Sequence, residues 1–279
     1  MIDSIIELAL KEDLGDGDHT SLSCVPEDAT GHAKLLVKDE GIIAGVSLAK
    51  RIFSTYDSTL KVDVHMLDGA KVKHGDIVFE VSGSSRSILA TERLVLNFMQ
   101  RMSAIATHTN KVVKLIEGTN TQLLDTRKTT PGIRALEKWA VTIGGGVNHR
   151  FGLYDMIMIK DNHIDYAGGI TKAIERANNY IESKNLKINI EIEVRDEKEL
   201  DEVLAIGKVD RIMLDNFTPD QIRAVLPKIP SKIETEASGG ITIDNIREYA
   251  ETDVNFISSG ALTHSVSSMD LSLKAVFKK

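Results

Sequence analysis

The protein has 279 residues, of which 42% are hydrophobic and 27% are charged, and its formal net charge is -7. These values are ordinary for a water-soluble globular protein and leave room for one large α/β domain, or for a small domain followed by a barrel. The acidic balance argues against a nucleic-acid surface, which needs a concentrated basic patch. Cys24 is the single cysteine, so an intrachain disulfide and a cysteine-rich zinc site are excluded.

The first residues predict an amphipathic helix that ends near Gly15, because apolar side chains recur at helical spacing from Ile2 to Leu10. Acidic residues interrupt this apolar pattern and no basic segment precedes it, which argues against a signal peptide. No apolar run approaches the roughly 20 residues of a membrane span. We therefore expect a cytoplasmic protein with neither a membrane nor a nucleic acid as partner.

Residues 31–88 carry short alternating runs with glycine-bearing turns, a pattern typical of antiparallel strands. Residues 90–118 follow as a helical segment that is apolar along one side. We interpret this segment as two helical pieces that meet near Ser103 and connect a small N-terminal domain to the rest of the chain.

After Asn120, six short apolar runs alternate with helix-like stretches. Repeated strand–helix alternation predicts parallel strands. A barrel is favoured over a doubly wound sheet because no strand opens with a GxGxxG turn, and the number of runs indicates fewer than eight strands. Each run ends in polar or charged residues, and the carboxyl ends of parallel strands are where such folds build their sites.

The run at residues 190–195 alternates apolar and charged side chains. In a barrel the apolar face packs on helices, so Glu191, Glu193 and Arg195 are expected to point to the lumen or mouth. Buried carboxylates there need cations, a metal or ligand hydroxyls, or else form an internal ion pair between strands. Both interpretations stay open, and Glu193 is favoured for a site because it lies nearer the strand end. Asp215, at the next strand end, is a candidate for holding Mg²⁺ or ribose hydroxyls, or for capping a helix.

Cations follow several of these runs. Arg127 and Lys128 end the first run, His149 and Arg150 follow a glycine-rich loop, and Lys160 ends the second run. Each alone would more often be a solvated surface charge, but equivalent strand ends and adjacent loops converge on one mouth. Arginine pairs bidentately with carboxylates and phosphates. Together these residues predict a site for a ligand with several negative charges.

Two of the last strand ends carry glycine, at residues 238–240 and 259–261. Glycine lets backbone N–H groups approach an anion, and barrels frequently bind phosphate with the loops after their last two strands. The pair of motifs predicts a phosphate site, with turn glycines that bind nothing as the alternative.

Several short motifs occur in one order along nearly the whole chain: "EDLGDGDHTS", "ATERLVLN", "DTRKTTPG", "IGGGVNHRFGL", "MIKDNHI", "EIEV", "LDNF", "SGGIT" and "SSGALTHS". This series resembles the quinolinate phosphoribosyltransferase family, the decarboxylating enzymes of NAD synthesis. No single motif would be sufficient, but "RKTTPG", "GGGVNHR" and "KDNH" at these spacings are highly specific.

The resemblance implies an α+β N-terminal sandwich domain followed by an open, seven-stranded (β/α) barrel. We place the sandwich at residues 1–107 and the barrel at residues 108–279, with a last helix at residues 266–279 that packs back on the N-terminal domain. It also implies transfer of phosphoribose from PRPP to quinolinate, with release of pyrophosphate and CO₂, a requirement for Mg²⁺ and a homodimer.

The resemblance further assigns roles to individual residues. Lys128, Glu193 and Asp215 would be catalytic, and the two carboxylates would hold Mg²⁺ directly or through ribose hydroxyls. Arg93 would reach into the site of the partner subunit. The complete predicted substrate-binding set is Arg93, Thr126, Arg127, Lys128, His149, Arg150, Lys160, Glu193, Asp215, Ser238, Gly239, Gly240, Ser259, Gly260 and Ala261.

Three alternatives keep the barrel. The first is a paralogous transferase that acts on another heteroaromatic acid. The second is a class I aldolase in which Lys160 forms a Schiff base beside the phosphate site. The third is a protein that binds phosphorylated ligands without turnover.

Overall fold

The computed structural model of the protein describes residues 1–276, and residues 277–279 lie outside the described part. The chain forms two compact units. The first, called the N-terminal unit below, comprises Met1–Lys111, Lys128–Gly145 and the segment from Ala261 on, and the second, the barrel unit, comprises Val112–Arg127 and Gly146–Gly260. Across residues 1–276, no helix combines the length and the apolar character that crossing a membrane requires.

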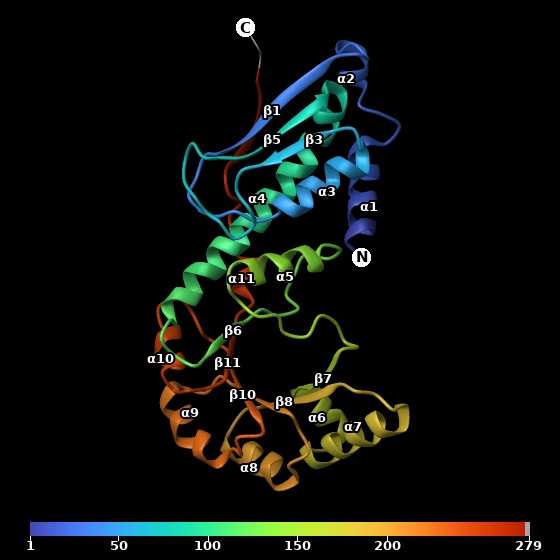
Figure 1. The fold of residues 1–279 in the computed structure, drawn as a ribbon. Coiled ribbons are helices and arrows are strands. Elements are labelled where there is room, and N and C mark those ends of the chain that lie inside the picture. The colour runs from blue at the N-terminus through green and yellow to red at the C-terminus, as the bar shows by residue number, and fades with distance from the viewer. Residues whose placement is uncertain (277–279) are drawn as a thin grey trace. The chain divides into compact units, whose positions relative to one another are not determined.

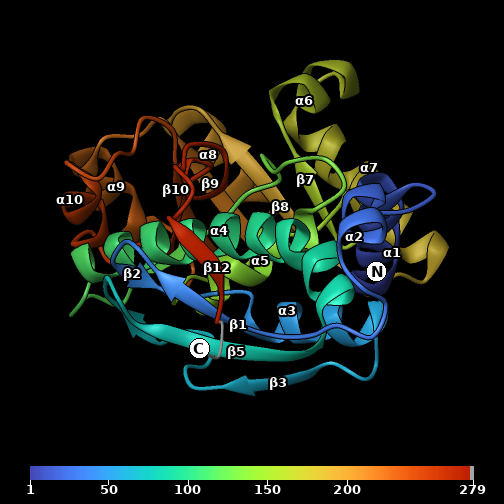
Figure 2. The same ribbon diagram turned by 90° about the horizontal axis from the view of Figure 1, so that it is seen from above.

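The N-terminal unit is built on a four-stranded antiparallel sheet in the order β12-β1-β5-β3. Its strands are β12 (Leu271–Ala275), β1 (Thr30–Val37), β5 (Ile77–Ser84) and β3 (Lys61–Val64). Figure 2 shows β12 running beside β1, although the two strands come from opposite ends of the chain. The antiparallel strands predicted between residues 31 and 88 are therefore confirmed.

Helices cover this sheet and complete the core of the unit. Phe53 of a helix meets Phe79 of β5 edge to face, with the ring centroids 5.9 Å apart, and both side chains are fully buried. The remaining elements are α1 (Ile2–Leu14), α2 (His19–Cys24), β2 (Gly41–Ile42), α3 (Val46–Tyr56), β4 (Lys71–Val72), α4 (Ser85–Leu115, whose last four residues belong to the barrel unit), α5 (Arg134–Ile143) and α11 (Ala261–His264).

Three features of this unit differ from the sequence interpretation. The helical segment is one continuous helix, α4, because Ser103 does not break it: its hydroxyl accepts the N–H of Ala44 at 2.9 Å and donates to the carbonyl of Ala44 at 3.1 Å. Helix α3 was not predicted at all. The predicted last helix at residues 266–279 is wrong, since residues 271–275 form a strand that pairs with β1, and its final residues, 277–279, lie outside the described part.

The barrel unit contains a parallel sheet of six strands in the order β6-β11-β10-β9-β8-β7. Figure 1 labels β6, β11, β10, β8 and β7 of this sheet. Leu124 also forms a parallel bridge with Val147, which adds a seventh position beside β6. The predicted open α/β barrel is thus confirmed. Its strands are β6 (Gln122–Leu124), β7 (Met156–Ile159), β8 (Asn189–Val194), β9 (Arg211–Asp215), β10 (Glu234–Ser238) and β11 (Phe256–Ser258).

Helices alternate with these strands, and their ends follow from the local sequence. Thr218 caps the helix that starts at Pro219 by accepting the N–H of Gln221, while the Gln221 side chain accepts the N–H of Thr218 at 2.8 Å. Asp196 caps the preceding helix in a similar way. The helices are α6 (Asp161–Ala167), α7 (Ile170–Lys184), α8 (Glu197–Ile206), α9 (Pro219–Val225), η1 (Leu226–Lys228) and α10 (Ile246–Ala250).

Candidate active site

Three neighbouring strands place charged groups at their carboxyl ends. Lys160 follows β7 directly, Glu193 lies near the end of β8, and Asp215 ends β9. The ammonium group of Lys160 lies 2.7 Å from Oε2 of Glu193. Burial raises the pKa of Asp215, and the negative charge of Glu193 raises it further. The structure therefore brings together all three residues, as their predicted positions required.

Glu193 and Asp215 place two carboxylates at neighbouring strand ends, and metal binding by them stays a prediction. The negative charge of Glu193 raises the cost of ionising Asp215, and both residues present oxygen ligands, which Mg²⁺ prefers. A bound cation would relieve this repulsion, while Lys160 and the side-chain amide of Asn216, which donates to Asp215 at 2.7 Å, already offset part of it.

Arg127 and Arg150 form a second group in the same unit. Burial lowers the pKa of Arg150, and the positive charge of Arg127 lowers it further. Both side chains are half-buried, and the guanidinium of Arg150 donates to the carbonyl of Met156 at 3.2 Å. Two guanidinium groups close enough to repel each other create a position that favours an anion.

His149 lies deeper than the sequence suggested. Only 4% of its side chain is exposed, and its Nε2 lies 3.0 Å from Glu191 and 3.3 Å from Glu236, two carboxylates that are fully buried. Its Nδ1 accepts the backbone N–H of Arg150 at 2.6 Å, and the backbone N–H of His149 donates to the carboxylate of Asp125 at 2.8 Å. These contacts orient the imidazole toward the interior of the unit, and direct binding of a substrate carboxylate by His149 stays a prediction.

Burial and ion pairing together set the pKa values of His149, Glu191 and Glu236. Burial alone lowers the pKa of His149, but the hydrogen bonds and charges of Glu191 and Glu236 outweigh it and raise the pKa to about 9. Burial, and then the charge of Glu236, raises the pKa of Glu191. Burial also acts to raise the pKa of Glu236, yet the hydrogen bond and the charge of His149 hold it below its usual range.

Arg211 extends the group. It lies 3.3 Å from Glu236 and 2.7 Å from Glu234, and its guanidinium stacks over the ring of Phe256, 4.2 Å from the centroid. One ligand atom from each of His149, Glu191 and Glu236 lies within 4.8 Å of the others, a spacing that a metal ion could also use. The contact with Arg211 and the full burial favour an internal ion network, which we call the buried network.

Local packing and hydrogen bonds explain part of the sequence of the two glycine-bearing strand ends. Gly239 has a φ of +89°, and a Cβ there would lie 2.3 Å from the side-chain oxygen of Asn216, whose N–H donates to Ser238 at 2.8 Å. Glycine is therefore needed for the loops after β9 and β10 to pack together. At the other motif, the N–H of Ser259 donates to Leu124 at 3.0 Å, so this donor is engaged with β6. Phosphate binding by either motif stays a prediction.

The remaining predicted residues divide between the two units. Thr126 is half-buried and Gly260 ends the barrel unit, while Arg93, Lys128 and Ala261 belong to the N-terminal unit. Arg93 is exposed on α4, and Lys128 is exposed in the turn that follows Arg127.

Comparison with known proteins covers nearly the whole chain. Residues 105–274 match the family model described as "Quinolinate phosphoribosyl transferase, C-terminal domain", and residues 18–103 match its "N-terminal domain" counterpart. The chain belongs to the quinolinate phosphoribosyltransferase family. The resemblance found in the sequence motifs is thereby confirmed.

Individual relatives agree with this assignment. The chain is 44% identical to "Quinolinate phosphoribosyltransferase [decarboxylating] 1b" of Nicotiana tabacum over 97% of its length and 81% of the relative. It is 45% identical to a probable nicotinate-nucleotide pyrophosphorylase of Bacillus subtilis, over 94% and 89%. A crystal structure of NadC from Streptococcus pyogenes matches with a TM-score of 0.93 and 37% identity, covering 100% of this chain and 97% of the other.

Two members of the buried network, Glu236 and Arg211, were not predicted from the sequence. A signal for Glu236 was present, because residues 234–237 alternate charged and small side chains much as residues 190–195 alternate apolar and charged ones. This alternation puts Glu236 on the lumen-facing side of its strand. Arg211 opens β9 and carries no such signal of its own.

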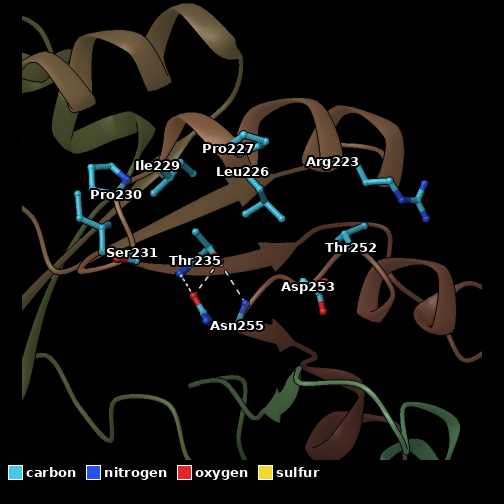
Figure 3. A pocket seen from close by; sticks show the side chains of 11 residues that line it. Arg223, Leu226, Pro227, Ile229, Pro230, Ser231, Thr235, Thr252, Asp253 and Asn255 are labelled. Carbon is cyan, nitrogen blue, oxygen red and sulfur yellow. Dashed lines mark hydrogen bonds between the residues drawn. The ribbon is translucent and has the colours of Figure 1, made fainter.

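A pocket of about 380 Å³ lies at the opposite, amino-terminal ends of β10 and β11 (Figure 3). Thr235 and Asn255 close its floor: the side-chain oxygen of Asn255 accepts the N–H of Thr235 at 2.8 Å and its hydroxyl at 2.9 Å. In parallel barrels this end contributes to stability and the carboxyl ends carry function. We therefore do not assign this pocket to the active site of the family.

Proposed function

We propose that the protein transfers phosphoribose from PRPP to the ring nitrogen of quinolinate, with loss of CO₂ and pyrophosphate, to give nicotinate mononucleotide for NAD synthesis. The match of both halves of the chain to one family supports the reaction. The placement of two half-buried guanidinium groups, those of Arg127 and Arg150, in one unit carries the substrate assignment, because a ligand with two carboxylates would offset their like charges.

Lys160 and the two arginines would hold the substrate anions. Quinolinate carries two carboxylates, and PRPP brings a phosphate and a pyrophosphate, so taking them out of water requires compensating cations. We assign Arg127 and Arg150 to the quinolinate carboxylates. Lys128, with its exposed side chain, is assigned to the phosphoribosyl donor.

Glu193 and Asp215 would bind the ribose hydroxyls and Mg²⁺. Magnesium, when bound, supplies positive charge to the departing pyrophosphate. As the bond between the ribose carbon and the pyrophosphate oxygen breaks, its electron pair leaves with pyrophosphate, and the ribose gains oxocarbenium character. The two carboxylates stabilise this positive charge, and the ring nitrogen of quinolinate then forms the new bond to the ribose carbon.

Decarboxylation follows from the new bond. The positively charged ring nitrogen accepts electron density from the neighbouring carbon, so the adjacent carboxylate leaves as CO₂ and a proton takes its place. This scheme needs no protein nucleophile, and catalysis rests on positioning and electrostatics.

We also propose a homodimer in which Arg93 completes the partner's site. The exposed position of Arg93 on α4 supports this role. Mixing inactive Arg93→Ala and Arg127→Ala subunits tests it, because a mixed dimer contains one site with both arginines. We expect recovery of about a quarter of the wild-type activity after random subunit exchange. No recovery would place both arginines in the same subunit's site.

The aldolase alternative is less well supported. A Schiff base requires the neutral amine of Lys160, and its ammonium group is engaged with Glu193 at 2.7 Å. The paralogous-transferase alternative differs only in the heteroaromatic acid. A cytoplasmic location stays a prediction from the sequence.

The decisive assay incubates the protein with PRPP, Mg²⁺ and quinolinate and follows CO₂ release, with nicotinate in a parallel reaction. Release of CO₂ with quinolinate alone is the expected result. Turnover of nicotinate without CO₂ would move the assignment to a monocarboxylate substrate. No turnover with either acid would contradict the proposed reaction and favour the paralogous transferase.

A further inference from the structure

The turn at residues 128–130 is held in the N-terminal unit by two separate helices. The hydroxyl of Thr263, in α11, donates to the carbonyl of Lys128 at 2.8 Å. A carboxylate oxygen of Glu137, in α5, accepts the N–H of Thr130 at 2.9 Å. The backbone is thus fixed at Lys128 itself and two residues beyond it.

A buried charge supports these contacts. Glu137 is fully buried, and its second oxygen accepts two hydrogen bonds from Arg101, at 3.0 and 2.8 Å. Arg101 also donates to the carbonyl of Thr263 at 2.6 Å. The four residues Arg101, Glu137, Thr263 and Lys128 are therefore connected by hydrogen bonds that tie α4, α5 and α11 to one turn. A buried carboxylate is costly unless such partners satisfy it.

The turn that receives this support is itself exposed. Lys128 and Thr130 are exposed, as are the following Pro131 and Gly132. An exposed turn can satisfy its backbone groups with water, so its own stability does not require a fully buried hydroxyl and a fully buried carboxylate. The lysine side chain, in contrast, has four flexible carbons, and ordering it on a ligand is costly unless its backbone is already fixed.

We propose that Thr263 and Glu137 are positioning residues that fix the backbone of Lys128 and so direct its ammonium group at the phosphoribosyl donor. The inference rests on the proposed function of Lys128. Neither residue touches substrate in this scheme, and each acts through the turn at residues 128–130.

Two substitutions at Thr263 isolate the hydroxyl. Thr263→Val removes it and keeps the shape of the side chain, whereas Thr263→Ser keeps it and removes the methyl group. In steady-state assays with quinolinate and PRPP, we expect kcat/KM for PRPP to fall about tenfold in Thr263→Val and to stay within about twofold in Thr263→Ser. Equal values in the two variants would overturn the proposal. Thr263→Ala removes the hydroxyl without crowding, and it must show the same loss.

A double-mutant cycle with Lys128→Met separates positioning from a general structural role. If Thr263 acts through the lysine, the double variant has the same kcat/KM as Lys128→Met alone, because there is no ammonium group left to direct. If the two losses multiply, Thr263 acts on something else and the inference is wrong. Thermal unfolding of all variants is measured in parallel.

The control is Thr121→Val at the start of β6. Thr121 is buried like Thr263, and its hydroxyl donates to the carbonyl of Val254 at 2.6 Å, so the substitution removes a similar bond. We expect kcat/KM for PRPP to stay at the wild-type value. Failure of the proposed function is distinguishable, because then the wild-type protein itself turns over no quinolinate. An active wild type with an unaffected Thr263→Val variant overturns the positioning role alone.

Discussion

The charged face of β8 presents three ionic side chains, two residues apart, at three depths. Glu191 is fully buried, the side chain of Glu193 is 12% exposed, and that of Arg195, just beyond the strand, is 48% exposed. The alternation that puts them on one face is the same for all three. Their surroundings differ: a buried charge must have fixed partners, whereas water solvates an exposed charge and weakens its pairs.

The partners of these residues change as their exposure increases along the strand. Glu191 contacts His149 within the buried network, where Arg211 supplies a second cation. Glu193 pairs with Lys160 at the strand ends, in the group that we assign to substrate. The buried part of this face, at Glu191, thus contributes to the stability of the fold, and we call it the inner end. The proposed chemistry lies two residues further on, at Glu193.

The largest expected effect is on stability, at the inner end. Glu236→Gln removes a buried charge that faces both His149 and Arg211, so we expect the free energy of unfolding to fall by about 3–5 kcal/mol. Urea unfolding at neutral pH measures this change. Glu234→Gln is the matched control, because Glu234 contacts the same Arg211 but is 47% exposed, and its loss should stay below about 1 kcal/mol. Similar losses in both variants would contradict the comparison.

At the level of Glu193 the expected effect moves from stability to activity. Lys160→Met should lower kcat/KM about 100-fold, because the lysine would no longer stabilise negative charge in the site. Its stability should change by less than about 1 kcal/mol, since the ion pair with Glu193 is 43% exposed on the lysine side. Lys172→Met, at an exposed lysine of α7, is the control. A fully active Lys160→Met enzyme would remove Lys160 from the proposed site.

The pH dependence of stability tests the inner end again. The pKa of His149 is raised to about 9, above the value of about 6.5 in an unfolded chain, so the native state binds the additional proton. The resulting stabilisation is fully present below pH 6.5 and is lost as the pH rises through 9, which we expect to cost about 3 kcal/mol. Urea unfolding at pH 6.5 and at pH 9 measures this loss of stability. His149→Asn should remove this slope, and His74→Asn, at an exposed histidine, should retain it.

Much of the fold was readable from the sequence, because strand and helix periods differ strongly in the barrel unit. One error comes from a tertiary contact and another from a local alternation that was missed. The sequence predicts that two helices meet near Ser103. In the structure the Ser103 hydroxyl forms hydrogen bonds with the backbone of Ala44, and the helix continues. Residues 271–275 were predicted as helix, although Leu271 and Leu273 alternate with polar residues as strand residues do.

The candidate site was predictable only in part. The positions of Lys160, Glu193 and Asp215 follow from strand ends alone, which any parallel sheet aligns. The buried network depends on register: Arg211 lies opposite Glu191 on one neighbouring strand and Glu234 on the other. The periodicity within one strand does not specify which residue of the next strand lies opposite, so this network required the structure.

The smallest effect is expected at the outer end. Arg195→Ala removes an ion pair with Glu199, in which Nε lies 2.9 Å from the carboxylate, and should lower the free energy of unfolding by less than about 0.5 kcal/mol. Because the Arg195 side chain is 48% exposed, high salt should abolish even this difference, whereas the loss in Glu236→Gln should persist in salt. Unfolding of both variants at low and high ionic strength tests the gradient directly. A salt-insensitive loss at Arg195 would mean that position in the sequence, and not depth, determines what these charges contribute.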